Sequence, residues 1–246
     1  MTAQERPDDH RTQAHRADQA LEQLGRLSFA EHSSHSVLQK VADLTKDVMP
    51  GSIEASVSVV VNDKPSTAVY TGQLALDCDE SQYGHGYGPC LHAARTGEVT
   101  EVPDARIEPR WADYARSAAE RGSLSSLSVP LPVSQHVRVA LNIYSREPHA
   151  FDEDSRSAAA RFAPYAAVAI ANMHQYQSAK AEASNLQVAL QSRAVIDQAK
   201  GVLMERHKLT ADRAFQALTQ ASMTKNRKLR DIAEHLVHTG EFPPAH

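Results

Sequence analysis

Hydrophobic residues recur along the chain with two different periods, and each period predicts a different kind of element. Residues 34–48 repeat apolar side chains every three to four positions, which predicts a helix with one buried face. Residues 55–61 alternate and then become continuously β-branched, which is typical of a strand. Further strands are expected at 67–74, 99–102, 124–131 and 137–144, and helices at 90–95 and 111–121. The mixture predicts an α/β (α+β) domain built on an antiparallel sheet.

The limits of this domain follow from polarity and from helix-breaking residues. Residues 1–12 are polar and are expected to be disordered, with a helix beginning near Ala14. We expect the first domain to occupy residues 13–172. Pro164 is expected to break or kink the helix that opens at 151–154, because proline lacks the N–H that a helix interior uses.

Residues 173–190 are expected to form a helical, coiled-coil connector. A sparse apolar seam at helical spacing runs through and beyond it, made of Tyr176, Leu186, Leu190, Ile196 and Leu203. Such a seam predicts a homodimer in which the connecting helix pairs with its copy. The alternative is a helix folded back onto its own first domain.

Three short helices are expected between Ser192 and Val237, in a C-terminal domain at residues 186–240. Thr210 is placed to cap the second helix, and Gly240 to end the third. The expected core includes Met204, Phe215, Leu218 and Leu229. So small an all-α domain is marginally stable unless its first helix extends upstream.

Composition narrows the class of protein. Of 246 residues, 41% are apolar and 23% charged, as in a globular protein. No apolar run approaches the roughly 18–20 residues that span a bilayer, and the first residues lack the apolar core of a signal peptide. We therefore expect a cytoplasmic protein without a membrane partner. Two cysteines, Cys78 and Cys90, form neither a disulfide framework nor a zinc ligand set.

The charge is unevenly distributed along the chain. The whole chain carries −4, but residues 186–246 hold nine Lys/Arg and six Asp/Glu, a net +3 that leaves −7 for the rest. Four cations, Lys225, Arg227, Lys228 and Arg230, lie within six residues. This concentration favours contacts with phosphates, whereas the plainer alternative is a solvated turn.

The C-terminal segment resembles the ANTAR domain, the RNA-binding module of bacterial transcription antitermination regulators. The matching residues span all three helices and are Ser192-Arg193, Ile196-Asp197-Gln198-Ala199-Lys200-Gly201-Val202-Leu203-Met204, Ala214-Phe215, Leu218, Ser222, Asn226, Lys228-Leu229-Arg230-Asp231 and Ala233. The resemblance implies binding to paired RNA hairpins in nascent transcripts, which prevents a terminator from forming.

A set of RNA-contacting residues is expected on this domain. The cations Arg193, Lys200, Lys225, Arg227, Lys228 and Arg230 would contact phosphates. The amides of Gln198 and Asn226 would read exposed loop bases, since proteins read RNA sequence mainly in single strands. Ala199 and Gly201 are small, so that a base or the RNA backbone could approach; the alternative is close helix packing.

The first domain resembles a GAF domain, and the GAF–ANTAR pairing is found in actinobacterial regulators. The residues that carry this resemblance are Gly86-Tyr87-Gly88-Pro89-Cys90-Leu91, Thr96-Gly97, Val102-Pro103-Asp104, Pro109-Arg110-Trp111, 125–131, 140–144 and Ala150-Phe151. The resemblance implies a sensor that receives a small-molecule ligand or the signal of an upstream protein. The candidate lining of its pocket is Tyr83, His85, Tyr87, Cys90, His92 and Trp111. The ligand cannot be read from the fold.

Other functions are less well supported by the sequence. His85, Cys90 and His92 raise the alternative of a metal or haem site, but the spacing lacks a CxxC or HxxxH pattern, so no metal or cofactor is expected. A DNA-binding helix-turn-helix is the nearest rival, although the turn at 222–227 is long for one. The chain has no P-loop, HExxH or GxSxG motif. We therefore expect a regulator that is not an enzyme.

Overall fold

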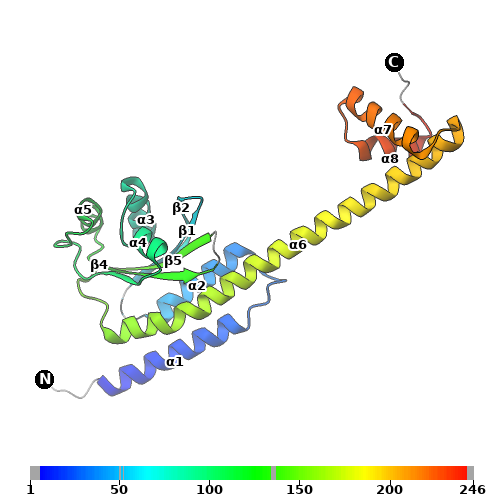
Figure 1. Ribbon diagram of the computed structural model, residues 1–246. Coiled ribbons are helices and arrows are strands. Elements are labelled where there is room, and N and C mark those ends of the chain that lie inside the picture. The colour runs from blue at the N-terminus through cyan, green and yellow to red at the C-terminus, as the bar shows by residue number, and fades with distance from the viewer. Residues whose placement is uncertain (1–5, 50, 52, 134–136, 243–246) are drawn as a thin grey trace. The chain divides into compact units, whose positions relative to one another are not determined.

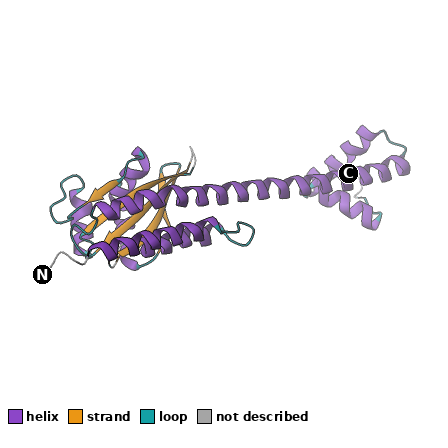
Figure 2. Cartoon of the chain, turned by 90° about the horizontal axis from the view of Figure 1, so that it is seen from below, coloured by secondary structure: helices purple, strands orange, loops and turns teal. Residues whose placement is uncertain are grey.

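The computed structural model describes residues 6–49, 51, 53–133 and 137–242. The chain divides into two compact units, Met1–Tyr176 and Gln177–His246. Every strand of the described residues lies in the first unit, and the described elements of the second are helices (Figures 1 and 2). None of the described helices is long and apolar enough to cross a membrane.

A five-stranded antiparallel sheet forms the centre of the first unit. Its order is β2-β1-β5-β4-β3. The strands are β1 (Ile53–Val61), β2 (Lys64–Tyr70), β3 (Thr100–Val102), β4 (Ser125–Pro132) and β5 (Val137–Ser145). Asn62 and Asp63 join β1 to β2 with φ of 50° and 59°, the left-handed conformation that a two-residue hairpin turn requires.

Helices cover both faces of this sheet (Figure 1). On one face lie α1 (Arg6–Gly25), α2 (Ser34–Val48) and the first part of α6 (Glu153–His207). On the other lie α3 (Gln73–His85), α4 (Pro89–Thr96) and α5 (Ala112–Glu120). The arrangement is therefore a three-layer sandwich, in which neither face of the sheet is left to solvent.

The two faces of the sheet differ in chemistry. Along β5, Val139, Leu141 and Ile143 join the large apolar core with α1, α2 and α6. The alternate residues Asn142 and Tyr144 face the other way and are also fully buried. Serines occupy the matching positions of β1 and β4, namely Ser56, Ser58, Ser126 and Ser128. One face of the sheet is thus apolar and the other polar, and both are buried.

Three sequence-based expectations for this unit are wrong. Helix α1 begins at Arg6, so residues 6–12 are helical rather than disordered, while residues 1–5 of that expectation lie outside the described residues; Pro7 falls in the first turn, where no N–H is needed. Helix α3 replaces the end of the expected strand at 67–74 and occupies the stretch after it, where no helix was expected, because its buried face includes polar residues that break the apolar pattern. Helix α6 continues through Pro164, so the expected break does not occur; Pro164 is exposed, while Phe162 and Ala166 beside it pack into the core.

The second unit is a three-helix core made by the end of α6, α7 (Ala211–Lys225) and α8 (Leu229–Thr239). Its buried residues are Ala199, Leu203, Ala214, Leu218, Ala221, Ile232, Ala233 and Leu236. The side chain of Thr210 accepts a hydrogen bond from the N–H of Arg213, which confirms the predicted cap. Gly240 ends α8 with a φ of 73°.

Some residues expected in this core or in the dimer seam lie elsewhere. Met204 and Phe215 were expected inside but are 37% and 44% exposed, because their positions fall on the outer faces of α6 and α7. Leu203 and Ile196 were expected in the seam but belong to the three-helix core, Leu203 fully buried and Ile196 partly. Leu186 and Leu190 remain exposed on α6.

Candidate functional site

A buried polar cluster occupies the space between the sheet and helix α3. At its centre lies Asp79, whose side chain is fully buried. Its Oδ1 accepts hydrogen bonds from the Tyr144 hydroxyl at 2.5 Å and the Asn142 amide at 3.1 Å. Its Oδ2 accepts them from the hydroxyls of Thr67 at 2.8 Å and Ser58 at 3.2 Å. Donors on β1, β2 and β5 thus converge on one carboxyl group of α3.

A second ring of hydrogen bonds ties this cluster to α4. The Tyr83 hydroxyl lies 2.7 Å from Ser58 Oγ, and Cys90 donates from its thiol to the same oxygen at 3.3 Å. Gln82 donates to the Tyr144 hydroxyl at 3.1 Å and accepts from the Cys90 N–H at 2.8 Å. The cluster therefore holds the second half of α3 and the start of α4 against the sheet.

Gly88 is required by the same contacts. Its φ is 155°, and a Cβ there would lie 2.4 Å from Gln82 Oε1, the atom that accepts the Cys90 N–H. Any side chain would displace Gln82 and break its link between α3 and α4. The glycine after Tyr87 thus serves the turn that brings Pro89 and Cys90 back under the sheet.

The electrostatics of the cluster are set by burial. Among the described residues, no Lys, Arg or His forms an ion pair with Asp79. Burial raises the pKa of the Asp79 carboxyl above its usual 3.8, and the hydrogen bonds from Tyr144, Ser56 and Thr67 offset only part of that rise. Burial likewise raises the pKa of the Tyr83 and Tyr144 hydroxyls, which stay protonated. The carboxyl is therefore biased toward its neutral form.

The polar face retains hydrogen-bonding capacity. Asn142 Oδ1 and Ser128 Oγ are buried and have no partner among the described residues. The two residues are register partners on β5 and β4, so the two atoms belong to one patch of the sheet. An unpaired buried polar atom costs about 1–3 kcal/mol. A small polar group that reached this patch would recover that cost.

The six candidate pocket residues do not converge on one pocket. Tyr83 and Cys90 belong to the buried cluster. His85 is exposed, whereas Tyr87 is half-buried against the cluster that contains Cys78 and Tyr114. The two ring centres lie 5.9 Å apart, and the Tyr87 hydroxyl donates to Asp113 at 2.9 Å.

The remaining two candidates are His92, which is exposed, and Trp111, which is 8% exposed and belongs to the buried cluster that Tyr87 packs against. The His92 ring lies 5.7 Å from that of Trp111, and the Arg110 guanidinium lies 4.5 Å above the indole. The six candidates are therefore divided: Cys90 and Trp111 are buried, Tyr83 and Tyr87 are half-buried, and His85 and His92 are exposed. Among the described residues, no group of three His, Cys, Asp or Glu side chains is arranged to hold a metal ion.

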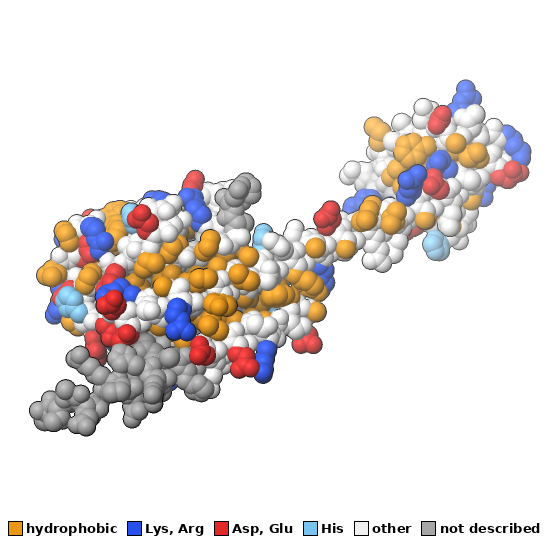
Figure 3. Space-filling model, turned by 60° about the horizontal axis from the view of Figure 1, so that its bottom comes forward, with side chains coloured by type: hydrophobic (Ala, Val, Ile, Leu, Met, Phe, Trp, Pro, Cys, Tyr) orange, Lys and Arg blue, Asp and Glu red, His pale blue; other side chains and the backbone are white. Residues whose placement is uncertain are grey.

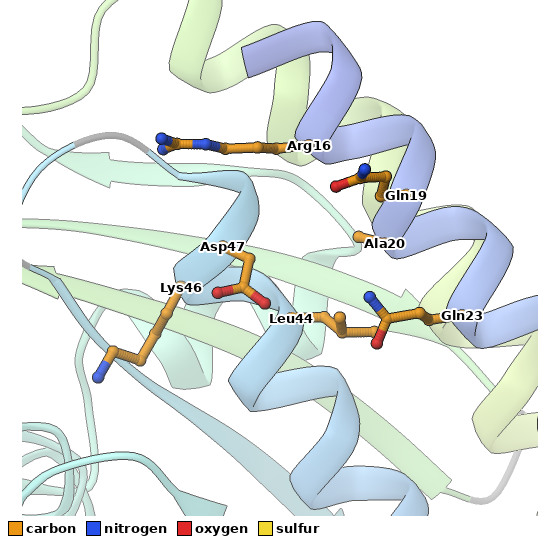
Figure 4. A pocket seen from close by; sticks show the side chains of 7 residues that line it. All are labelled: Arg16, Gln19, Ala20, Gln23, Leu44, Lys46 and Asp47. Carbon is orange, nitrogen blue, oxygen red and sulfur yellow. The ribbon is translucent and has the colours of Figure 1, made fainter. Parts of the chain in front are cut away.

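The first unit also has hollows on its other side. One of about 240 Å³ lies between α1 and α2, lined by Arg16, Gln19, Ala20, Gln23, Leu44, Lys46 and Asp47 (Figure 4). Another, of about 150 Å³, is apolar and lies between α2, α6 and the sheet, with Val37, Val139, Ile170 and Met173 in its wall. Neither includes any of the six candidate pocket residues, so both are separate from the polar cluster.

The predicted RNA-contacting cations of the second unit fall into two groups. Lys225, Arg227 and Lys228 are exposed on the turn between α7 and α8, and none has an ion pair or side-chain hydrogen bond among the described residues. The other three are paired with carboxylates. Arg193 and Lys200 lie 3.9 Å and 3.0 Å from Asp197, and Arg230 lies 2.7 Å from Glu234.

The four uncharged candidates are also divided. Ala199 is fully buried in the three-helix core, so helix packing explains its size and it cannot face RNA. Gly201 is exposed, and a Cβ there would have no atom within 4 Å. Gln198 is exposed on the same side of α6. Asn226 is exposed and ends α7 in the left-handed conformation, with a φ of 49°.

Comparison with known families agrees with this architecture. The family model of the GAF domain matches residues 31–171, more than half of the chain, and that of the ANTAR domain matches residues 184–237. The chain belongs to the GAF domain family and carries an ANTAR domain. GAF domains are sensor modules and ANTAR domains are RNA-binding antitermination modules, so this GAF–ANTAR chain is a regulator rather than a member of a catalytic family. No curated protein matches it.

Solved structures share the fold of the GAF domain. The free methionine-R-sulfoxide reductase from Neisseria meningitidis, in complex with its substrate, aligns with a TM-score of 0.53 and 17% identity over 68% of this chain and 93% of that one. The GAF domain of a Coxiella burnetii phosphoenolpyruvate-protein phosphotransferase aligns with a TM-score of 0.51 and 16% identity, over 69% of this chain and 98% of that one. A putative GAF sensor protein from Burkholderia vietnamiensis aligns with a TM-score of 0.51 and 15% identity, over 72% of this chain and 99% of that one. At these identities only the fold is shared.

Sequence reasoning missed the centre of the buried cluster. Asp79 was given neither an element nor a role, and Asn142 was counted as part of a strand without a role of its own. The available signal was the run Ala140–Tyr144, in which one amide interrupts apolar residues. Similarly, Ser56 and Ser58 alternate with apolar residues along β1. Such alternation usually indicates that the polar side of the strand faces solvent. Only the helices above the sheet reveal that this side is buried.

The raised pKa of Asp79 predicts a pH-dependent stability. The folded protein binds this proton more tightly than the unfolded chain, whose value is near 3.8. The contribution is therefore fully present below pH 3.8 and is lost as pH rises through the folded pKa. We expect urea unfolding to show this loss in the wild type and not in Asp79→Asn, with the fluorescence of Trp111 as the sensor-domain signal. Parallel pH profiles of the two proteins would contradict the assignment.

The two cysteines are expected to be unreactive in the folded protein. Both are completely buried, and burial raises the pKa of the Cys78 thiol to about 12 and that of Cys90 further. Because the thiolate is the reactive form, a thiol reagent at pH 8 should label neither residue until the chain is unfolded. Mass spectrometry of native and urea-unfolded samples measures this; labelling of either cysteine in the native protein would refute the expectation.

Proposed function

We propose that this protein binds paired RNA hairpins through its ANTAR domain and thereby prevents terminator formation under the control of its GAF domain. The observation that carries the proposal is the exposed turn with three unpaired cations, Lys225, Arg227 and Lys228. Phosphate contacts dominate the affinity of proteins for nucleic acids, and cations without an internal partner are available for them.

The conformation of this turn favours binding. Asn226 adopts the left-handed conformation, and the Ser222 hydroxyl donates to the Arg227 carbonyl at 2.6 Å. The turn is therefore fixed before RNA arrives, which lowers the ordering cost of binding. Lys228 precedes α8, whose first N–H groups also favour an anion.

The paired cations add a second layer of contacts. Arg193, Lys200 and Arg230 are held by carboxylates on the same helix at partly exposed positions. Surface pairs of this kind contribute little to stability. A phosphate can replace Asp197 or Glu234 as the partner at small cost, so these residues support binding without being its main source.

Dimerisation is part of the proposal, because two hairpins call for two ANTAR domains. Leu186 and Leu190 are 61% and 60% exposed and lie one helical turn apart on α6. Exposed leucines on one side of a helix support pairing with a second copy. Figure 3 shows a further band of apolar side chains on the face of the GAF domain where α1 and α6 lie.

The buried cluster supports a sensing role rather than catalysis. Cys78 and Cys90, the candidate nucleophiles, are buried with raised pKa values, so they are protonated. We propose that a small polar ligand forms hydrogen bonds with the polar patch at Ser128 and Asn142. The fold does not specify which ligand this is. A DNA-binding role has no such support from the family matches.

Removal of the unpaired cations should weaken RNA binding. In Lys225→Ala/Arg227→Ala/Lys228→Ala, we expect affinity for a two-hairpin RNA to fall at least 10-fold. Each lost phosphate contact should also reduce the magnitude of the slope of log affinity against log salt by about 0.7–0.9, which is about 2.1–2.7 for the three together. Titrations at several salt concentrations measure both quantities.

The matched control removes the same charge from the GAF domain. Lys46→Ala/Lys64→Ala/Arg95→Ala replaces three exposed cations there and should leave binding unchanged. Equal losses in both variants would reduce the turn to generic positive surface. If the wild type bound RNA with scrambled loops as tightly as RNA with native loops, or preferred duplex DNA, the hairpin proposal itself would be overturned.

Charge placed on the leucine face should separate the dimer. We expect Leu186→Glu/Leu190→Glu to sediment as a monomer at concentrations where the wild type sediments as a dimer. Val188→Glu is the control, because Val188 is 47% exposed on the opposite side of α6 and should not change the mass. A monomeric wild type, or a dimeric double variant, would exclude this interface.

A further inference from the structure

The hollow between α1 and α2 lies in the first unit, on the side of the sheet opposite the buried polar cluster (Figure 4). Its volume of about 240 Å³ is below the range of about 300–1,000 Å³ that is typical of pockets for drug-sized ligands. A molecule that occupies it is therefore a small metabolite rather than a nucleotide or a large cofactor.

The hollow has an apolar floor and a polar rim. Ala20 on α1 and Leu44 on α2 line it and are each only 1% exposed. Arg16, Gln19 and Gln23 recur at i, i+3 and i+7, which places them along one side of α1. Figure 4 shows the two glutamine side chains on the side of α1 that faces α2. A ligand there would contact apolar groups below and polar groups around its edge.

The rim carries opposite charges that do not pair with each other. Arg16 on α1 and Asp47 on α2 both line the hollow. Neither forms an ion pair or a side-chain hydrogen bond with any residue that the structure describes. By contrast, Asp18 on the same face-forming helix α1 pairs with Arg161 of α6 at 3.4 Å. A ligand with one negative and one positive group would give Arg16 and Asp47 the partners that the chain does not supply.

The end of α2 favours one orientation of such a ligand. Asp47 lies in the last turn of α2, where the helix carbonyls also favour a positive charge. A ligand ammonium is therefore favoured at this end, and a ligand carboxylate is favoured at Arg16, whose guanidinium can donate two parallel hydrogen bonds to it. Lys46 extends away from α1 in Figure 4, so it adds positive charge without closing the hollow.

Ligands with a charge of one sign fit the rim less well. A phosphate would be attracted by Arg16 and Lys46 but repelled by Asp47, and an amine or metal ion would meet the reverse situation. An uncharged ligand would leave both charges without a partner. The combination of rim and floor thus selects a zwitterion with a small apolar part.

We propose that the hollow between α1 and α2 binds a free amino acid with a small apolar side chain. Its carboxylate pairs with Arg16, its ammonium pairs with Asp47, and its side chain lies against Ala20 and Leu44. The site is separate from the polar patch on the other face of the sheet, and it does not depend on the proposed RNA-binding function.

This position connects the ligand to the long helix. Ala17 and Leu24 of α1 are buried in the same core as Phe162 of α6, and Asp18 of α1 pairs with Arg161 of α6. A ligand that joins α1 to α2 therefore restrains a helix that also packs against the first part of α6. The amino acid thus acts on the helix that continues into the ANTAR domain.

The test compares three probes that differ only in their charged groups. L-norvaline carries both groups, pentanoate lacks the ammonium and butylamine lacks the carboxylate. Each is titrated into the full-length ¹⁵N-labelled protein, and amide chemical shifts are followed. We expect norvaline to shift the amides of residues 16–24 and 44–49 saturably, with a dissociation constant of about 1 mM, because exposed ion pairs contribute little in water. Pentanoate and butylamine should each bind about 5-fold more weakly.

Two substitutions should change the selectivity in different ways. Asp47→Asn should lower norvaline affinity about 3–5-fold and abolish its advantage over pentanoate, because the ammonium loses its partner. Arg16→Gln should lower norvaline affinity to a similar extent and abolish its advantage over butylamine. Asp43→Asn and Arg26→Gln are the matched controls, since both residues are exposed on the same two helices and do not line the hollow. The controls should bind all three probes as the wild type does.

The remaining outcomes would overturn the site. If norvaline causes no saturable shift, or if all three probes shift the same amides with equal affinity, the hollow does not select a zwitterion. Shifts centred on Ser128 and Asn142 instead would assign the amino acid to the polar patch and exclude the hollow. None of these results bears on hairpin binding, which is measured separately, so failure of this site and failure of the RNA-binding proposal are distinguishable.

Discussion

The GAF domain depends on a sheet with two buried faces of opposite character. Strand β5 sends Leu141 into the apolar core and its neighbour Asn142 into a polar one, and neither is exposed. Apolar burial needs only area, but polar burial needs partners. Asp79 and the hydroxyls around it supply them, which fixes where α3 lies over the sheet. The position of α4 follows, because Gln82 joins it to the same cluster.

Helix α6 contributes to one hydrophobic core in each of the two units. Phe162 and Met173 are buried with the apolar face of the sheet, and Ala199 and Leu203 are buried with α7 and α8. The ANTAR domain is too small to bury much surface alone, so its stability depends on this shared helix. The exposed stretch of α6 between residues 177 and 190 contributes to neither core, which leaves its leucines available for contacts outside the chain.

The ANTAR domain separates its stabilising residues from its binding residues. Its core is built from small and branched residues such as Ala199, Leu218 and Ile232, and its unpaired cations occupy a turn that contributes no core residue. The exception is Gly201, an exposed position in a helix where the residue present is not the one that helix stability favours. Departures of this kind are expected where a surface serves binding rather than folding.

The sequence by itself determined the order of domains, most helices and strands, the caps at Thr210 and Gly240, and the basic turn, because periodicity, capping and charge are local properties. Only the tertiary structure decided that Ser58, Asp79 and Asn142 meet, since they come from three elements and their polarity hides the burial. It also placed Ala199 inside and Gly201 outside, two residues apart on one helix. A helix pattern identifies its apolar face, but which of two small residues lies under a neighbouring helix depends on how the helices pack.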